Sequence, residues 1–150
     1  MKAFTFRLET LLHLRVMAKD RAIKDYACAI SKREELESQL TEAVGNLKML
    51  NNEIHLKRTV GFAGSDQQVF NQSILLSKEM IIDLNSKVAD SKNIETAKRT
   101  IFLTADSNCK SLLKLKDKQQ KEHLIAEEKK EESELEDIIG ARFVFNNSNY

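Results

Sequence analysis

The side chains that most often do chemistry are few in this chain and far apart. The three histidines are His13, His55 and His123, and the two cysteines are Cys28 and Cys109. None of them has a neighbour at the short spacing that metal ligands on one helix or loop share. We therefore expect no metal site and no cofactor, and two free thiols that fit a reducing compartment.

Other patterns that could support catalysis are equally weak. The stretch Gly61-Phe-Ala-Gly64 lacks the lysine that completes a phosphate-binding loop. The carboxylates of residues 127–137 form a continuous run rather than a pair held in a cleft. Two thin helices would also offer no pocket that excludes water from a reaction. We expect no catalytic residues, no small-molecule ligand and no enzymatic activity.

Charge is segregated along the chain although the net charge is only +1. Residues 2–24 and 110–121 are basic, whereas residues 122–137 are acidic. Basic surfaces can bind nucleic acid, but Phe4 and Phe6 are the only aromatic residues in the basic stretches that could stack on bases. The acidic run would also repel phosphate. We expect no nucleic-acid partner, and each charge run also has the simpler interpretation of a solvated helix surface.

The sequence predicts a cytoplasmic protein. Charged residues interrupt the apolar part of the N-terminus, so we expect no signal peptide. No stretch approaches the roughly 20 apolar residues of a membrane span. Residues 4–24 could form a helix on a membrane surface, but we favour the alternative that their leucines face a second helix.

The spacing of helix-breaking residues predicts two long helices. The chain has no proline, and Ala, Glu, Lys, Leu and Arg supply 69 of its 150 residues, a composition typical of coiled coils. Gly61 and Gly64 lie close together, and Gly140 precedes a polar tail. We predict an all-α fold: one antiparallel coiled-coil hairpin over residues 1–150, with helix one at 5–58, a turn at 59–65, helix two at 66–139 and a frayed tail at 141–150. Ser65 and Gln68 would form a capping box, and helix two would overhang helix one.

Apolar and small residues recur at steps of three and four in both helices and predict their register. Folding the chain back at Phe62 places Leu40 opposite Leu84, Leu36 opposite Val88, and Leu12 opposite Leu112. We call this facing set of positions the seam.

The middle of the seam is less regular. Arg33 would face Ser91 and could pair diagonally with Glu95. Two interpretations stay open: a loosened or bent section, or a rotated seam formed by Ile30, Ile94 and Ile101.

The N-terminal residues carry a family resemblance. The run Phe4-Thr-Phe6-Arg7-Leu8-Glu-Thr-Leu11-Leu12-His-Leu14-Arg15, followed by spaced alanines, resembles the start of the FliJ family of flagellar export proteins. Phe70-Asn-Gln-Ser-Ile74 is similar to the family's Phe-x-Gln-x-Leu stretch after the turn.

The resemblance implies a stalk in flagellar type III protein export. Such a stalk would bind the export ATPase ring, contact the membrane export gate and escort export chaperones with their substrates, at the cytoplasmic face of the cell membrane. For the ring we predict Phe6, Arg7, Leu8, Leu11, Leu12 and Arg15, together with the stretch around Leu112 to Lys121 and the overhang. For the gate the resemblance suggests Phe70 and Ile74.

Competing interpretations remain at this level. The leucines of the N-terminal run could simply hold the hairpin together, and Phe70 and Ile74 could be seam residues opposite Ile54 and Leu50. The chain could also be a generic coiled-coil adaptor, a chaperone, or a coiled coil associated with nucleic acid. The corresponding stalk of a virulence secretion system would have the same physical features.

Overall fold

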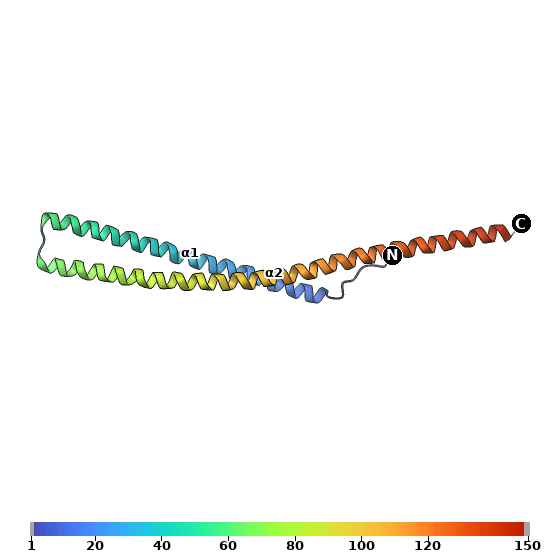
Figure 1. Ribbon diagram of the computed structural model, residues 1–150, viewed down its shortest axis with the longest axis horizontal. Helices are drawn as coiled ribbons and strands as arrows, with labels where there is room; N and C mark the ends of the chain where they lie inside the picture. Colours follow the sequence, from blue (N-terminus) through green and yellow to red (C-terminus); the bar gives the residue numbers. More distant parts are fainter. Residues whose placement is uncertain (1, 149–150) are drawn as a thin grey trace. The chain divides into compact units, whose positions relative to one another are not determined.

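The computed structural model describes residues 2–148 and contains two helices, α1 (Glu9–Val60) and α2 (Gly64–Ser148) (Figure 1). The part of the chain it describes has no strand. The two helices are joined by three residues and pack against each other, so the predicted all-α helical hairpin is confirmed. Helix α2 has 85 residues and α1 has 52, so α2 continues past the start of α1.

The turn occupies residues 61–63, inside the predicted range. Gly61 has a φ of 95°, a conformation that residues with a Cβ rarely adopt. Its amide donates a hydrogen bond of 2.9 Å to the carbonyl of Lys57, which closes the last turn of α1. A single glycine therefore ends α1 and reverses the chain.

The start of α2 differs from the predicted capping box. The amides of Asp66 and Gln67 both donate hydrogen bonds to the carbonyl of Ala63. Ala63 therefore takes the capping position, and Ser65 lies two residues too late to cap. Asp66 still falls in the first turn, where its carboxylate interacts favourably with the helix dipole.

Both outer helix boundaries also differ from the predicted ones. Helix α1 begins at Glu9 rather than near residue 5, because Phe4 and Phe6 lie in an extended segment whose side chains pack on α2. Helix α2 runs through Gly140 to Ser148 rather than ending at residue 139. Gly140 has no left-handed conformation and only weakens a helix by about 1 kcal/mol, which is too little to end it. Of the predicted frayed tail, residues 141–148 are helical, and residues 149–150 lie outside the described residues.

The chain divides into two compact units, which are considered separately. The turn unit consists of Asp20–Leu103, and the terminal unit consists of Met1–Lys19 together with Thr104–Tyr150. Both helices contribute to each unit.

The core of the turn unit confirms the predicted register. Leu36, Ala43, Leu84 and Val88 form one buried cluster, and Leu40 and Ile81 pack against it. These are the residues that folding the chain at Phe62 sets face to face. Large side chains meet small ones across the contact, which is how two helices interdigitate without leaving cavities.

The middle of the turn unit keeps the same seam. Ala22, Ala29 and Ser91 are buried there, whereas Ile94 and Ile101 are both more than half exposed. The interpretation of a rotated seam built on these isoleucines is therefore wrong. The Ser91 hydroxyl donates a hydrogen bond of 2.7 Å to the carbonyl of Val88, so this buried polar group is satisfied within its own helix.

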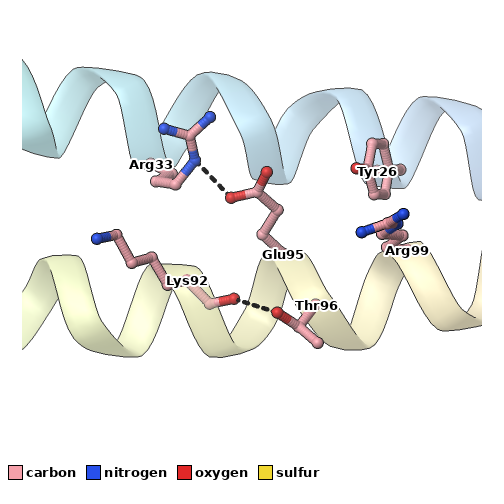
Figure 2. Close-up of a pocket in the computed structure, with 6 residues that line it drawn as sticks. All are labelled: Tyr26, Arg33, Lys92, Glu95, Thr96 and Arg99. Carbon is pink, nitrogen blue, oxygen red and sulfur yellow. Dashed lines mark hydrogen bonds and ion pairs between the residues drawn. The ribbon is translucent and has the colours of Figure 1, made fainter.

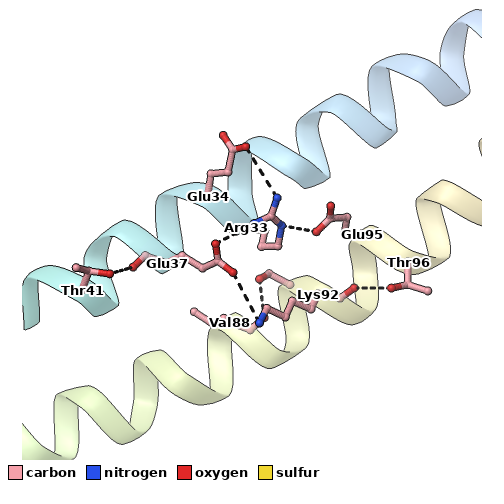
Figure 3. Close-up of polar contacts among 9 residues, drawn as sticks. Arg33, Glu34, Glu37, Thr41, Val88, Lys92, Glu95 and Thr96 are labelled. Atoms are coloured by element: carbon pink, nitrogen blue, oxygen red, sulfur yellow. Dashed lines mark hydrogen bonds and ion pairs between the residues drawn. The ribbon is translucent and has the colours of Figure 1, made fainter. Parts of the chain in front are cut away.

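A polar network flanks these small residues (Figure 3). The Arg33 guanidinium donates to Glu95 on the opposite helix and to Glu37 on its own helix, and Lys92 also pairs with Glu37. The predicted diagonal pair of Arg33 and Glu95 is thus confirmed. Hydrogen bonding to Glu95 is the main cause that raises the pKa of Arg33.

An open groove of about 350 Å³ lies beside this network, between α1 and α2 (Figure 2). Its walls carry Tyr26 and Arg33 from α1 and Lys92, Glu95, Thr96 and Arg99 from α2. Tyr26 also packs against Phe102 with ring centroids 6.2 Å apart. In the groove, Arg33 and Lys92 form ion pairs with carboxylates of the opposite helix. The charged side chains therefore do not converge on one point.

Because the seam is buried, two substitutions close together on α2 should change the free energy of unfolding by very different amounts. Leu84 is 4% exposed and Ile82 is 69% exposed, and the two residues flank Asp83. Leu84→Ala should lower the free energy of unfolding by about 2–5 kcal/mol, because it removes methyl groups from a packed core. Ile82→Ala should change it by less than about 0.5 kcal/mol. Urea unfolding followed by circular dichroism measures both; equal effects would contradict the seam.

Candidate functional site

The predicted ring-binding residues lie in the terminal unit, at the start of the chain. Residues 2–6 are extended, and Phe6 is buried in a cluster with Leu12 and Cys109. Leu8 packs on the edge of the same cluster, together with Phe4, Val16, Leu112 and Leu115. Phe6, Leu8 and Leu12 therefore hold the N-terminal segment to α2, in line with the alternative that they stabilise the hairpin.

Local hydrogen bonds fix this segment in place. The amide of Glu9 donates to the carbonyl of Phe6, which forms the turn before α1. His123 Nε2 lies 2.9 Å from the Lys2 carbonyl oxygen, and the Phe4 ring packs against the imidazole with centroids 5.6 Å apart. The His123 contact could not be predicted from residue types, because its partner is a backbone atom.

The other predicted ring-binding residues face outward. Arg7 and Leu11 are exposed, and Arg15 is partly exposed. Within residues 2–148, neither arginine forms a hydrogen bond or an ion pair. The predicted ring-binding residues therefore form two sets. The inner set, Phe6, Leu8 and Leu12, packs on α2. The outer set, Arg7, Leu11 and Arg15, is available to a partner.

Ion pairs join the two helices next to these residues. Glu9 pairs with Lys116 at 2.9 Å, and Lys19 pairs with Asp106 at 3.3 Å. Lys110 also pairs with Asp106 at 2.8 Å. The hydrogen bond from Lys110 is the main reason why the pKa of Asp106 is lowered, and Lys19 adds to it. The same bond raises the pKa of Lys110.

The overhang is the part of α2 beyond the N-terminal segment, residues 128–148. Every residue in it is exposed. Its first half carries most of the acidic run, and from Leu135 onward it carries exposed apolar side chains, among them Leu135, Ile138, Ile139, Phe143 and Phe145. A helix that is exposed on all sides yet presents this much apolar surface offers a large area to a partner.

The predicted gate-binding residues lie in the turn unit and are half-buried. The Phe70 ring packs edge-on against Phe62 with centroids 5.3 Å apart, and Lys57 Nζ lies 5.1 Å above it. Ile54 beneath the turn is buried, as the register requires. Phe70 was predicted from the sequence but its two partners were not, and Lys57 meets it only because the chain reverses at Gly61.

A cleft of about 660 Å³ opens beside Phe70. Leu56, Val60 and Phe62 give it apolar walls, and Glu53, Lys57 and Asp66 line its edge. Leu56 and Val60 are strongly exposed, so the turn presents uncovered apolar surface. Ile74 is half-buried one turn further along α2.

The described residues show no arrangement typical of an active site. Residues 2–148 hold no cluster of three or more His, Cys, Asp or Glu side chains that could bind a metal ion. Cys28 is exposed and Cys109 is buried, and both are free. In the same residues, neither helix includes a stretch apolar and long enough to span a bilayer.

The lowered pKa of Asp106 predicts a pH-dependent contribution to stability. A carboxylate with a lowered folded pKa stabilises above its ordinary value of 3.8, and this stabilisation disappears as the pH falls through the folded pKa. Asp106→Asn should therefore lower the melting temperature at pH 7, and the difference should disappear as the pH falls through the lowered pKa of the folded protein. Asp83→Asn, which removes only an exposed pair with Lys87, is the control. Thermal unfolding across pH tests this, and a constant difference would contradict it.

Comparison with known proteins agrees with this geometry. The family model for the flagellar FliJ protein matches residues 4–148. A curated relative, the flagellar FliJ protein of Bacillus subtilis (strain 168), is 22% identical over 142 residues, which cover 95% of this chain and 97% of the relative. Comparison with solved structures gave no match. Because the family model covers nearly the whole chain, the chain belongs to the flagellar FliJ protein family and is a component of flagellar protein export.

Proposed function

We propose that the chain is a non-enzymatic stalk of the flagellar type III export apparatus. In this proposal the terminal unit binds the export ATPase ring, and the turn unit contacts the membrane export gate. The observation that carries the proposal is the pair of unpaired arginines, Arg7 and Arg15, on the terminal unit of a helical hairpin that belongs to the FliJ family.

The ring contact rests on the chemistry of these arginines. A guanidinium stays charged at any physiological pH and pairs with a carboxylate through two parallel hydrogen bonds. Neither arginine forms a hydrogen bond or an ion pair within residues 2–148. The N–H donors of both can therefore pair with acidic side chains on a ring subunit. Leu11 lies four residues from each in the sequence, one helical turn before Arg15 on α1, and adds apolar contact area.

The inner set supports this surface without touching the partner. Phe6 and Leu12 are buried against Cys109, which fixes the direction in which Arg7 leaves the chain. Leu112 belongs to the same cluster, and the exposed residues that follow it, up to Lys121, widen the proposed contact on α2. The overhang adds further exposed surface to the same unit.

The gate contact rests on the turn unit. Phe70 and its neighbours form a cleft with apolar walls and charged edges, the composition that protein-binding surfaces favour. We propose that Phe70, supported by Phe62, forms the centre of this contact and that Ile74 lies at its edge.

The remaining partners follow from the same proposal. Export chaperones with their cargo would meet the chain while it is bound to the ring, at the cytoplasmic face of the membrane near the flagellar base. A stalk of this kind needs neither a cofactor nor a metal ion.

The ring contact predicts an effect on ATP hydrolysis. Adding the purified protein to its cognate flagellar export ATPase should raise ATP turnover. Arg7→Glu should weaken ring binding by about tenfold, roughly 1.4 kcal/mol, because it replaces an attraction by a repulsion. Arg58→Glu, at an exposed site at the end of α1, should bind as wild type does.

The controls separate two failures. Circular dichroism must show equal helix content in all variants. Unchanged affinity of the Arg7 variant would remove that residue from the site, and no stimulation by folded wild-type protein would contradict the stalk function itself.

The gate contact predicts a different loss. Phe70→Ala should weaken binding to the cytoplasmic part of the gate protein by about tenfold, because it empties the centre of the cleft. Ile82→Ala removes an exposed apolar side chain from the same helix and should leave binding unchanged. Calorimetric titration measures both affinities. Equal affinities for the two variants, with both folded, would place the contact elsewhere.

A further inference from the structure

Helix α2 carries a second apolar stripe in the terminal unit, apart from the seam. Leu113, Leu124 and Leu135 are 46%, 47% and 57% exposed. They are spaced eleven residues apart, which is close to three full turns of an α-helix, so all three lie along one side of α2. Cys109 is buried and Leu112 is half-buried on the same stretch. Both belong to the contact with the N-terminal segment instead.

The charges along the same stretch change sign at the central leucine. Residues 110–121 carry five lysines and one aspartate, whereas residues 122–137 carry eight carboxylates and two lysines. Leu124 lies close to the border between these two segments, with Leu113 in the basic one and Leu135 in the acidic one.

We propose that a second copy of this chain covers the stripe when the chain is not bound to the proposed ring partner, with the two α2 helices antiparallel around a two-fold axis at Leu124. In this arrangement Leu124 meets the same residue of the second copy, and Leu113 of each copy meets Leu135 of the other. A two-fold contact uses one surface twice, so a stripe that is symmetric about its centre can pair with itself.

The charge distribution selects the antiparallel orientation. Antiparallel pairing sets the basic segment of one copy beside the acidic segment of the other, and each favourable contact occurs twice. Lys114, which forms no ion pair or hydrogen bond within residues 2–148, then lies beside the acidic segment of the second copy. Parallel pairing would set acidic run beside acidic run, which is strongly unfavourable.

The surface next to the axis is hollow. A cleft of about 380 Å³ lies between the N-terminal segment and α2, and Phe4 and Leu124 form its apolar side. The leucine of a second copy can bury part of its side chain there. An anionic membrane or a nucleic acid would instead have to approach the eight carboxylates of residues 122–137, so these charges favour a second copy over both.

The first experiment measures the association of the full-length protein. Sedimentation over an about hundredfold range of protein concentration should show a monomer–dimer equilibrium that high salt shifts toward monomer. Leu124→Glu should raise the dissociation constant of the dimer by at least about tenfold, because it sets two carboxylates against each other at the axis. Leu76→Glu is the matched control, since Leu76 is 59% exposed on the turn unit, and it should leave the constant within about twofold.

The second experiment tests the orientation. In a Cys28→Ser background, Leu124→Cys should form a disulfide between two copies under oxidising conditions, because the two-fold axis brings these residues together. Leu135→Cys alone should not, since its neighbour is residue 113. A protein that stays monomeric at every concentration, or a Leu135→Cys variant that cross-links as fast as Leu124→Cys, would overturn the proposal. Binding to anionic vesicles or nucleic acid by a monomer would overturn it as well.

Discussion

The contact between α1 and α2 in the turn unit is the interaction on which the rest depends. Leu36, Leu40 and Ala43 meet Ile81, Leu84 and Val88 there, and little else holds two exposed helices together. Isolated helices are marginal in water, and most of their stability comes from packing an apolar face. In the terminal unit, residues of the N-terminal segment pack on Cys109 in line with the same register. A slip of the register would therefore also remove this contact with Cys109.

Small residues and ion pairs have complementary roles in this contact. Ala22, Ala29 and Ser91 contribute little apolar area, but they let the helix backbones approach closely. Arg33 then reaches Glu95 across the contact, and in the terminal unit Lys19 reaches Asp106. Exposed ion pairs add little to stability, yet a wrong register would set like charges together. These pairs therefore favour one register over its neighbours more than they strengthen the hairpin.

Residue spacing was sufficient to predict the two helices and the pairing of Leu40 with Leu84, and the glycines at 61 and 64 predicted the turn within residues 59–65. It was not sufficient at the ends. Gly140 looks like a stop signal, but nothing in the surroundings stabilises a left-handed residue there. The extended segment before Glu9 depends on Phe6 finding the surface of α2, which is a tertiary effect. The family resemblance identified Arg7 and Phe70 as candidates, but could not tell that Phe6 is buried or that Phe62 and Lys57 flank Phe70.

The account depends on a chain that folds back once, and a distance between two spin labels tests this most directly. Cysteines at the exposed positions Glu42 and Asp83, in a Cys28→Ser background, carry the labels, and excess unlabelled protein removes distances between copies. Packed helix axes lie about 8–10 Å apart, so the account predicts one distance below about 30 Å. An unbroken helix would separate the two positions by about 60 Å, and that result would contradict it.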